Sequence, residues 1–156
     1  MTLQERKLDL TDWKLLEILQ EDGRISYREL GQKIGLSTPA VSERVRKLEE
    51  VGVIVGYGAR LDLAKLDRVI TAFVSVNTRP ERNDPLQDFV KKTPEVLEAH
   101  YITGQASFIL KISLTSIAAL EDFIKRLSHF GPTQTSIVLS THVESRVIRE
   151  KGHYAS

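Results

Sequence analysis

The sequence predicts an α+β protein, with three helices at its N-terminus and a βαββαβ arrangement after them. Two observations support this fold class. Between residues 11 and 52, capping residues and glycines bracket three short segments whose apolar residues recur at helical spacing. From residue 69 onward, four segments with strand-like alternation are separated by two helix-like segments.

The chain has 156 residues, enough for two small domains that each bury a core. We expect a helical domain over residues 1–62, a linker over 63–68, the βαββαβ domain over 69–150 and a tail over 151–156.

Local signals predict the first two helices. Thr11 can cap the first helix, and Gly23 ends its run of apolar residues. Ser26 and Glu29 form a capping box at the start of the second helix, in which each side chain satisfies the other residue's backbone donor. Gly35 then closes this short helix.

The third helix, residues 37–52, follows after a very tight turn and is capped by Ser37. Val41, Val45 and Leu48 make one apolar stripe along it, so its other sides are free to face outward. Two helices joined this closely must cross at a steep angle. The pattern is typical of a helix-turn-helix.

A β-hairpin is predicted over residues 53–62, where Gly56-Tyr57-Gly58 offers glycines for the positive φ angles of a tight turn. This hairpin would be a wing. The N-terminal domain is therefore expected to be a winged helix-turn-helix.

In the second half, strands are predicted over residues 69–77, 96–102, 108–114 and 135–143. Asp84-Pro85 begins the helix after the first strand, and Ser116 or Thr115 caps the helix before the last one. The apolar residues expected to face inward from this last helix are Ile117, Leu120, Ile124 and Leu127.

This element order is that of a ferredoxin-like sandwich, in which both helices cover one face of an antiparallel sheet. The other face would include Phe73, Ile109 and Val138. An apolar sheet face without helices of its own usually meets another subunit, so we expect a homo-oligomer.

Charge is unevenly distributed along a chain whose net charge is only +1. Residues 1–22 hold three basic and six acidic side chains, whereas residues 23–47 hold six basic and two acidic ones. The chain has no cysteine, no apolar run long enough to cross a bilayer and no signal-peptide core. We expect a cytoplasmic protein, and the DNA binding predicted from its helix-turn-helix would associate it with the nucleoid.

A helix-turn-helix inserts its third helix into the DNA major groove, which is about 12 Å wide. Phosphate contacts are expected from Ser37 and Thr38 at the helix N-terminus, and positioning contacts from Arg24, Lys47 and Tyr57. The residues expected to approach base edges are Pro39, Ser42, Glu43 and Arg46. The alternative is that Ser37 only caps the helix and the charges only solvate it. For Arg44, nearer the buried edge, a structural ion pair is as well supported as a phosphate contact.

No pattern predicts chemistry on a substrate. The four histidines show no close helical ligand spacing, and no nucleophile elbow, P-loop or dinucleotide fingerprint occurs. We therefore expect no catalytic residue, no metal and no cofactor. The turn at residues 103–107 places small polar residues at the end of the sheet, where it is either a ligand site or an ordinary hairpin turn.

Taken together, the N-terminal residues resemble the DNA-binding domain of the Lrp/AsnC, or feast/famine, regulators. The residues that carry this resemblance are Leu8-Asp9, Asp12, Leu15-Leu16, Asp22-Gly23-Arg24, Leu30, Gly35-Leu36-Ser37, Arg44-Val45, Leu48 and Gly52-Val53-Ile54. The resemblance continues through nearly the whole chain.

The resemblance implies a sequence-specific transcriptional regulator of double-stranded DNA that dimerises through its sheet and assembles into tetramers or octamers. It also implies a small effector, commonly an amino acid, bound between subunits. The residues implied for that site are Thr103, Gly104, Gln105 and Ser107, with Thr135 and Ser136 on a facing wall. This chain has Ser107 where many members have an aspartate, and serine offers only a neutral hydrogen bond.

Two other functions compete with an effector-controlled regulator. One is an architectural protein that wraps or bends DNA without an effector, which the serine at position 107 favours. The other is an enzyme, because some tetrapyrrole decarboxylases resemble the family in both domains. Such an enzyme has no need of the basic residues Arg24, Arg46 and Lys47 that this chain keeps.

Overall fold

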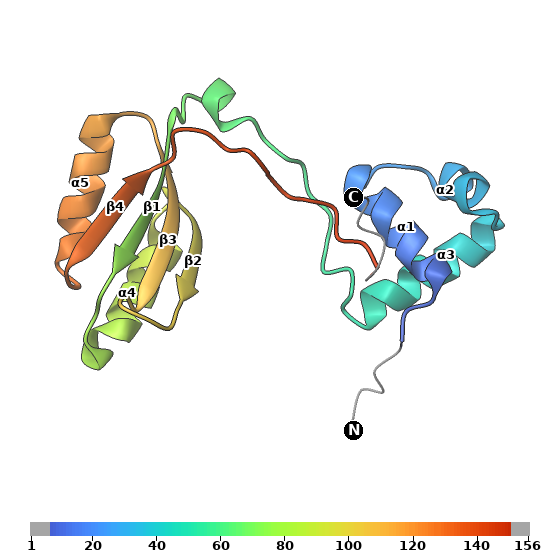
Figure 1. Ribbon diagram of the computed structural model, residues 1–156, viewed down its shortest axis with the longest axis horizontal. Helices are drawn as coiled ribbons and strands as arrows, with labels where there is room; N and C mark the ends of the chain where they lie inside the picture. The colour runs from blue at the N-terminus through green and yellow to red at the C-terminus, as the bar shows by residue number, and fades with distance from the viewer. Residues whose placement is uncertain (1–6, 151–156) are drawn as a thin grey trace. The chain divides into compact units, whose positions relative to one another are not determined.

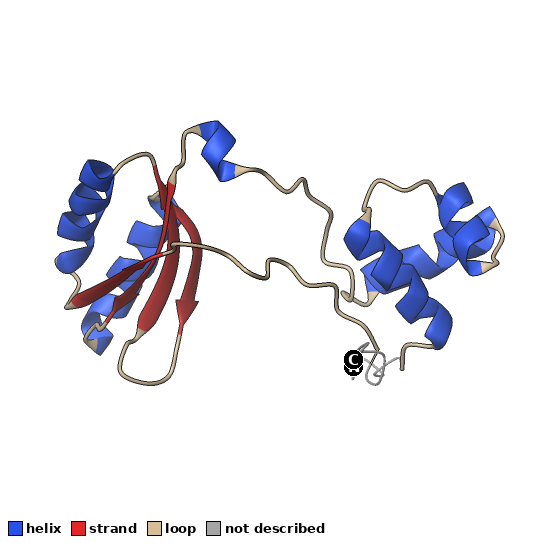
Figure 2. Cartoon of the chain, turned by 45° about the horizontal axis from the view of Figure 1, so that its top comes forward, coloured by secondary structure: helices blue, strands red, loops and turns tan. Residues whose placement is uncertain are grey.

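The computed structural model describes residues 7–150 and divides the chain into two compact units. Among the described residues, the helical unit comprises 7–60 together with 143–150, and the sheet unit comprises 61–142. Figures 1 and 2 show the elements of each unit. The predicted tail, residues 151–156, lies outside the described residues.

The helical unit contains α1 (Leu10–Glu21), α2 (Tyr27–Ile34) and α3 (Thr38–Glu50). Asp9, rather than Thr11, caps α1. The Asp9 carboxylate accepts a hydrogen bond from the Asp12 backbone N–H at 2.8 Å, and the Asp12 carboxylate accepts one from the Asp9 N–H at 3.2 Å. The carboxylate of Asp9, two residues before Thr11, thus accepts from a backbone N–H of the first turn, and Thr11 lies within that turn.

The caps predicted for the next two helices are confirmed. Ser26 and Glu29 form the reciprocal capping box, and Gly35 ends α2 in the left-handed conformation with φ of 73°. The Ser37 side chain accepts a hydrogen bond from the Ala40 N–H at 3.4 Å. Local hydrogen bonding therefore fixes the α2–α3 turn, as the sequence indicated.

One apolar cluster holds the three helices together. Val41, Val45 and Leu48 are fully buried, which confirms the predicted stripe on α3. Leu15 of α1 and Leu30 of α2 are fully buried against the same cluster, with Trp13 packed on it. The single tryptophan of the chain therefore reports on this unit.

The predicted wing is wrong in its conformation, because residues 53–60 form no strand. Two backbone N–H groups, those of Val53 and Ile54, donate to the Leu48 carbonyl at 2.9 and 3.1 Å. Further along, the Tyr57 hydroxyl donates to Glu49 Oε1 at 2.9 Å. These contacts draw the segment back to the end of α3 instead of leaving a hairpin tip.

The segment 143–150, expected in the second domain, groups with the helical unit. The Gln20 side-chain amide donates to the Ile148 carbonyl at 3.0 Å and accepts from the Ile148 N–H at 2.9 Å. Arg149 forms ion pairs with Glu17 at 3.5 Å and Glu21 at 3.7 Å. These contacts attach the segment to α1.

The sheet unit has the predicted βαββαβ order. Its elements are β1 (Ile70–Val76), α4 (Asn83–Lys92), β2 (Val96–Tyr101), β3 (Phe108–Leu114), α5 (Ile117–Ser128) and β4 (Thr133–Ile137), with short 3-10 helices over Leu63–Leu66 and Pro80–Arg82. The strands are antiparallel in the order β2-β3-β1-β4. This is the strand order of a ferredoxin-like sandwich.

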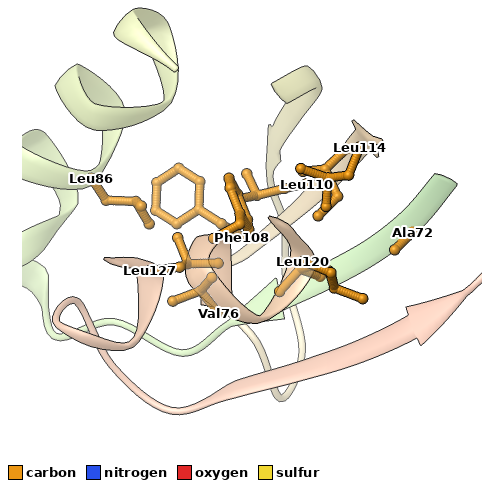
Figure 3. Packing of buried hydrophobic residues seen from close by; sticks show 11 residues of the cluster. Ala72, Val76, Leu86, Phe108, Leu110, Leu114, Leu120 and Leu127 are labelled. Atoms are coloured by element: carbon orange, nitrogen blue, oxygen red, sulfur yellow. The ribbon is translucent and has the colours of Figure 1, made fainter. Parts of the chain in front are cut away.

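Both helices pack on one face of the sheet (Figure 1), and a single core lies between the layers. Figure 3 shows side chains of the sheet and of both helices meeting in this core, among them Val76, Leu86, Phe108, Leu110, Leu120 and Leu127.

Three details of this unit differ from the sequence prediction. Ile117 is 61% exposed, and Phe123 is the fully buried residue between Leu120 and Leu127 on the stripe of α5. The helix predicted to start at Asp84-Pro85 starts at Asn83, because the 3-10 turn before it runs directly into α4.

The last strand is shorter than predicted. It pairs with β1 only from Thr133 to Ile137, and Val138 makes one more hydrogen bond, to the Thr71 carbonyl at 2.9 Å. Because β1 itself begins at Ile70, the later residues have no partner strand to extend along.

The sheet face opposite the helices is mixed rather than apolar. Strand alternation places Phe73 and Ile109 on it beside Glu98 and Lys111, whose side chains form an ion pair at 3.0 Å. Phe73 is 39% exposed, so a large aromatic side chain remains partly uncovered there.

Candidate nucleic-acid interface

The turn between α2 and α3 depends on close backbone contact. The Leu36 N–H donates to the Gly31 carbonyl at 2.9 Å, and a Cβ placed on Gly31 would lie 2.4 Å from the Leu36 carbonyl oxygen. Only glycine fits such an approach. Our sequence reasoning missed Gly31, although a glycine inside a helical segment is itself a signal of close packing.

This turn presents the N-terminal half of α3 outward. The buried stripe holds one side of the helix, and the predicted contact residues on the other sides are all exposed. They are Ser37, Thr38, Pro39, Ser42, Glu43, Arg46 and Lys47. The structure thus brings these seven together on one surface that ends at the N-terminus of α3.

Charged side chains on this surface form a paired network. Arg46 makes a bidentate contact with Glu43, in which Nη2 lies 2.9 Å from both carboxylate oxygens. Arg46 also forms an ion pair with Glu50, one helical turn later. The ammonium nitrogen Nζ of Lys47 lies 3.1 Å from Oε1 of Glu43. Hydrogen bonds from Arg46 and Lys47 hold the pKa of Glu43 below its usual range.

Arg44 belongs to the interior side of α3. Its guanidinium lies 2.7 Å from the buried carboxylate of Asp12 and 2.8 Å from that of Asp9. The hydrogen bonds from the Asp12 backbone and from Arg44 hold the pKa of Asp9 below its ordinary value. Arg44 therefore has the structural ion pair that was one of its two predicted roles.

The two remaining predicted DNA contacts lie outside α3. Tyr57 is half-exposed, and its hydroxyl donates to the Glu49 carboxylate. Partial burial, and to a smaller extent the hydrogen bond to Glu49, raise the pKa of Tyr57 to about 12. Arg24 is exposed at the end of α1, where its backbone N–H donates to the Asp22 carboxylate at 2.9 Å. Its side chain is thus placed by the turn that follows α1.

The predicted ligand residues are only partly brought together. Thr103, Gly104 and Gln105 are exposed in the turn between β2 and β3. Thr135 and Ser136 lie on β4, with β1 between them and that turn. As consecutive residues of one strand, they point to opposite faces of the sheet.

Ser107 makes several contacts within the chain. Its hydroxyl accepts from the Thr78 N–H at 3.2 Å and lies 3.3 Å from the Asn77 side-chain oxygen and the Thr78 carbonyl. This residue therefore ties the end of β1 to the turn.

Neither a metal centre nor a membrane span is found between residues 7 and 150. No three histidine or acidic side chains in this range come together as metal ligands. The helices within it are too short or too polar to cross a bilayer.

Known families match both units. Residues 8–49 match the AsnC-type helix-turn-helix domain, and residues 71–148 match the Lrp/AsnC ligand binding domain. The chain belongs to the Lrp/AsnC family. The resemblance seen in the sequence is confirmed, and the chain is an Lrp/AsnC-type transcriptional regulator rather than an enzyme.

Individual Lrp/AsnC relatives agree with this assignment over most of their length. The HTH-type transcriptional regulator YezC of Bacillus subtilis is 41% identical over 134 residues, which are 86% of this chain and 95% of YezC. The structure of B. subtilis LrpC has a TM-score of 0.85 at 35% identity and covers 90% of this chain and 99% of LrpC.

A second Lrp/AsnC-like structure contains a ligand. It is a transcriptional regulator from Neisseria meningitidis in complex with L-methionine, with a TM-score of 0.85 at 31% identity. It covers 91% of this chain and 96% of its own.

Proposed function

We propose that this regulator reads double-stranded DNA with the exposed N-terminal half of α3. The observation that carries the proposal is the division of α3 into two sides. On one side, Val41, Val45 and Leu48 are fully buried. On the other, every residue between positions 37 and 47 that has a hydrogen-bonding side chain is exposed, except Arg44. Ser37 and Thr38 would hold phosphates, and Ser42, Glu43 and Arg46 would meet base edges with Pro39 beside them.

Arg24, Lys47 and Tyr57 are proposed as positioning contacts around this helix. Arg24 and Lys47 are exposed cations, and Tyr57 exposes half of its surface although its hydroxyl is bonded to Glu49. Such groups fix the register of a protein on the duplex without reading its sequence. Action on the chromosome would place the protein in the cytoplasm, at the nucleoid.

We also propose a homodimer formed through the open face of the sheet, with dimers assembling into tetramers or octamers. The partly exposed Phe73, with Ile109 beside it, supports the use of this face as an interface. Glu98 and Lys111 make the face more polar than the sequence indicated. A two-fold dimer predicts roughly palindromic DNA sites, with half-sites about one helical turn or a multiple apart.

An amino-acid effector is proposed for the sheet unit, at the turn with Thr103, Gly104, Gln105 and Ser107. The complex of the Neisseria regulator with L-methionine supports it. Thr135 and Ser136 of a neighbouring subunit would supply the facing wall. The engaged hydroxyl of Ser107 favours a second candidate, an architectural regulator that binds DNA without an effector.

Selection from a random duplex pool tests the DNA-binding proposal, followed by titration of the selected and scrambled duplexes. We expect a clear preference for the selected site, and equal binding to both would contradict the proposal. Calorimetry with a panel of amino acids, combined with measurement of the oligomer size, distinguishes an effector-controlled regulator from an architectural one. Heat of binding together with a change in oligomer size supports an effector. The absence of both responses supports the architectural role.

A further inference from the structure

The second helix, α2, carries two exposed cations, Arg28 in its first turn and Lys33 in its last. Gly31 between them fixes which side of α2 faces α3. A Cβ placed on Gly31 would lie 2.4 Å from the Leu36 carbonyl oxygen and 3.4 Å from the Val41 side chain. The Gly31 side of α2 therefore meets the start of α3.

Helical spacing places the two cations on different sides of α2. Arg28 comes three residues before Gly31, so it lies on the same side, one turn further along the helix. Lys33 comes two residues after Gly31, about 200° around the helix, and so lies on the opposite side. There Lys33 lines a hollow together with Asp22 and Glu29.

The side of α2 that carries Arg28 faces in the same direction as the outer face of α3. Gly31 packs on Val41, which belongs to the buried stripe of α3, so α3 lies between α2 and the duplex that its outer face is proposed to meet. The two helices of a helix-turn-helix cross at about 90–120°, so the first turn of α2 extends past α3 instead of running along it. A side chain at this position can reach the DNA backbone beside the groove.

Arg28 also has a charge that no carboxylate offsets. The neighbouring Glu29 is engaged by the capping box, where its carboxylate accepts from the Ser26 hydroxyl at 2.7 Å and from the Ser26 N–H at 3.2 Å. Between residues 7 and 150, the Arg28 side chain has no acidic partner in an ion pair. On α3, by contrast, Arg46 and Lys47 each pair with a carboxylate of their own helix.

From this geometry we infer that Arg28 binds a DNA phosphate beside the groove that α3 enters, and that Lys33 does not. The inference rests on the proposed function, namely that the outer face of α3 meets the duplex, and adds a residue of α2 to that interface. Cations that neutralise phosphates supply affinity for every sequence, and such contacts carry no sequence information. Arg28 therefore contributes to affinity and to its salt dependence, but not to the choice of site.

Arg28→Gln and Lys33→Gln remove the same charge from the same helix, so this pair of variants tests the side of the helix rather than the total charge. Arg28→Lys keeps the charge and tests for rescue. Each full-length variant is titrated with the selected duplex and with a scrambled duplex across a series of salt concentrations. A cation in the first turn opposes the helix macrodipole, so Arg28→Gln should not lower the thermal unfolding temperature measured by tryptophan fluorescence.

For Arg28→Gln we expect binding to both duplexes to weaken about three- to tenfold, with the ratio between them unchanged. The slope of log affinity against log salt should become shallower by at most about 0.9, because one phosphate contact is lost. Arg28→Lys should keep the wild-type slope, since a phosphate also accepts lysine as a point charge. Lys33→Gln should change the affinity by less than about twofold, because salt screens a charge on the far side of the helix.

Equal losses from Arg28→Gln and Lys33→Gln would overturn the inference, because they would reflect the total charge of the protein. A loss confined to the selected duplex, an unchanged salt slope, or binding by Arg28→Lys as weak as that by Arg28→Gln would overturn it as well. In each of these cases the proposed function survives if wild-type protein prefers the selected duplex and Arg46→Ala weakens that preference. If wild-type protein shows no preference, the proposed function fails, and this inference fails with it.

Discussion

The inner edge and the outer face of α3 each carry an arginine, and the two have different environments. Arg44 pairs at 2.7 Å with Asp12, whose side chain is only 1% exposed. Arg46 pairs with Glu43 and Glu50, whose side chains are about half exposed. Both residues sit in the same helix with one residue between them, and both are held by two carboxylates.

The comparison shows that helical phase, rather than residue type, sets the role of a charge. Arg44 is adjacent to the buried stripe at Val41, Val45 and Leu48, so its partners come from α1. Arg46 points away from that stripe, and its partners come from α3 itself. The ion pairs of Arg44 join α3 to α1, whereas those of Arg46 lie within α3 alone, on the face proposed to meet DNA.

Arg44→Ala should have the largest effect on stability. It leaves the Asp12 carboxylate buried without its arginine, and removing one partner of a buried pair costs about 3 kcal/mol in the free energy of unfolding. Urea unfolding followed by Trp13 fluorescence measures this unit specifically. If Arg44→Ala and Arg46→Ala unfold at the same urea concentration, the two arginines do not differ as we describe.

Asp9→Asn should have a smaller and pH-dependent effect. Asparagine still caps α1, so only the half-exposed pair with Arg44 is lost, at a cost of roughly 0.5 kcal/mol near neutral pH. The folded state lowers the pKa of Asp9, so its stabilisation is present above the ordinary pKa and disappears as pH falls through the lowered value.

The stabilities of wild type and Asp9→Asn should therefore begin to converge as pH falls below the ordinary Asp9 pKa of 3.8, and should become equal once pH is below the lowered value. Urea midpoints across a pH series check this expectation. A difference that persists at the lowest pH would assign the effect to the cap rather than to the charge.

Gln20→Ala should release the segment 143–150 while leaving the three helices intact. The variant loses both hydrogen bonds to the Ile148 backbone, and exposed bonds of this kind contribute about 0.5 kcal/mol. Limited proteolysis should cut this segment about twofold faster than in wild type. Gln32→Ala, on the exposed side of α2, is the control and should be cut at the wild-type rate.

Arg46→Ala should have the smallest effect on stability. Its pairs with Glu43 and Glu50 are exposed and lie within one helix, so they hold no two elements together. The urea midpoint by Trp13 fluorescence should match that of wild type. A clear drop would give Arg46 a structural role like that of Arg44.

Features set by local sequence could be predicted, and features set by distant contacts could not. The Ser26 box and the Ser37 cap involve partners three residues away, so the sequence alone contains them. The βαββαβ order follows from periodicity alone. In the candidate site, the buried stripe of α3 predicted which side of the helix would be exposed.

Most of the missed features depend on partners that are distant in the sequence, and the Asp9 cap of α1, three residues from its partner Asp12, is a local exception. Tyr57 bends back to Glu49, so the predicted hairpin does not form. Ile148 meets Gln20 across 128 positions of the chain. Even on α3, the sequence indicated the exposure of Arg46, but only the side-chain geometry showed that Glu43 and Glu50 hold it from both sides.

The most direct test of DNA reading by the outer face of α3 is a titration of wild type and Arg46→Ala against every single-base variant of the selected duplex. We predict that Arg46→Ala loses about tenfold to a hundredfold in affinity for the selected site and no longer discriminates at one base position. A uniform loss across all variants, or no loss at all, would contradict a base-reading role for Arg46.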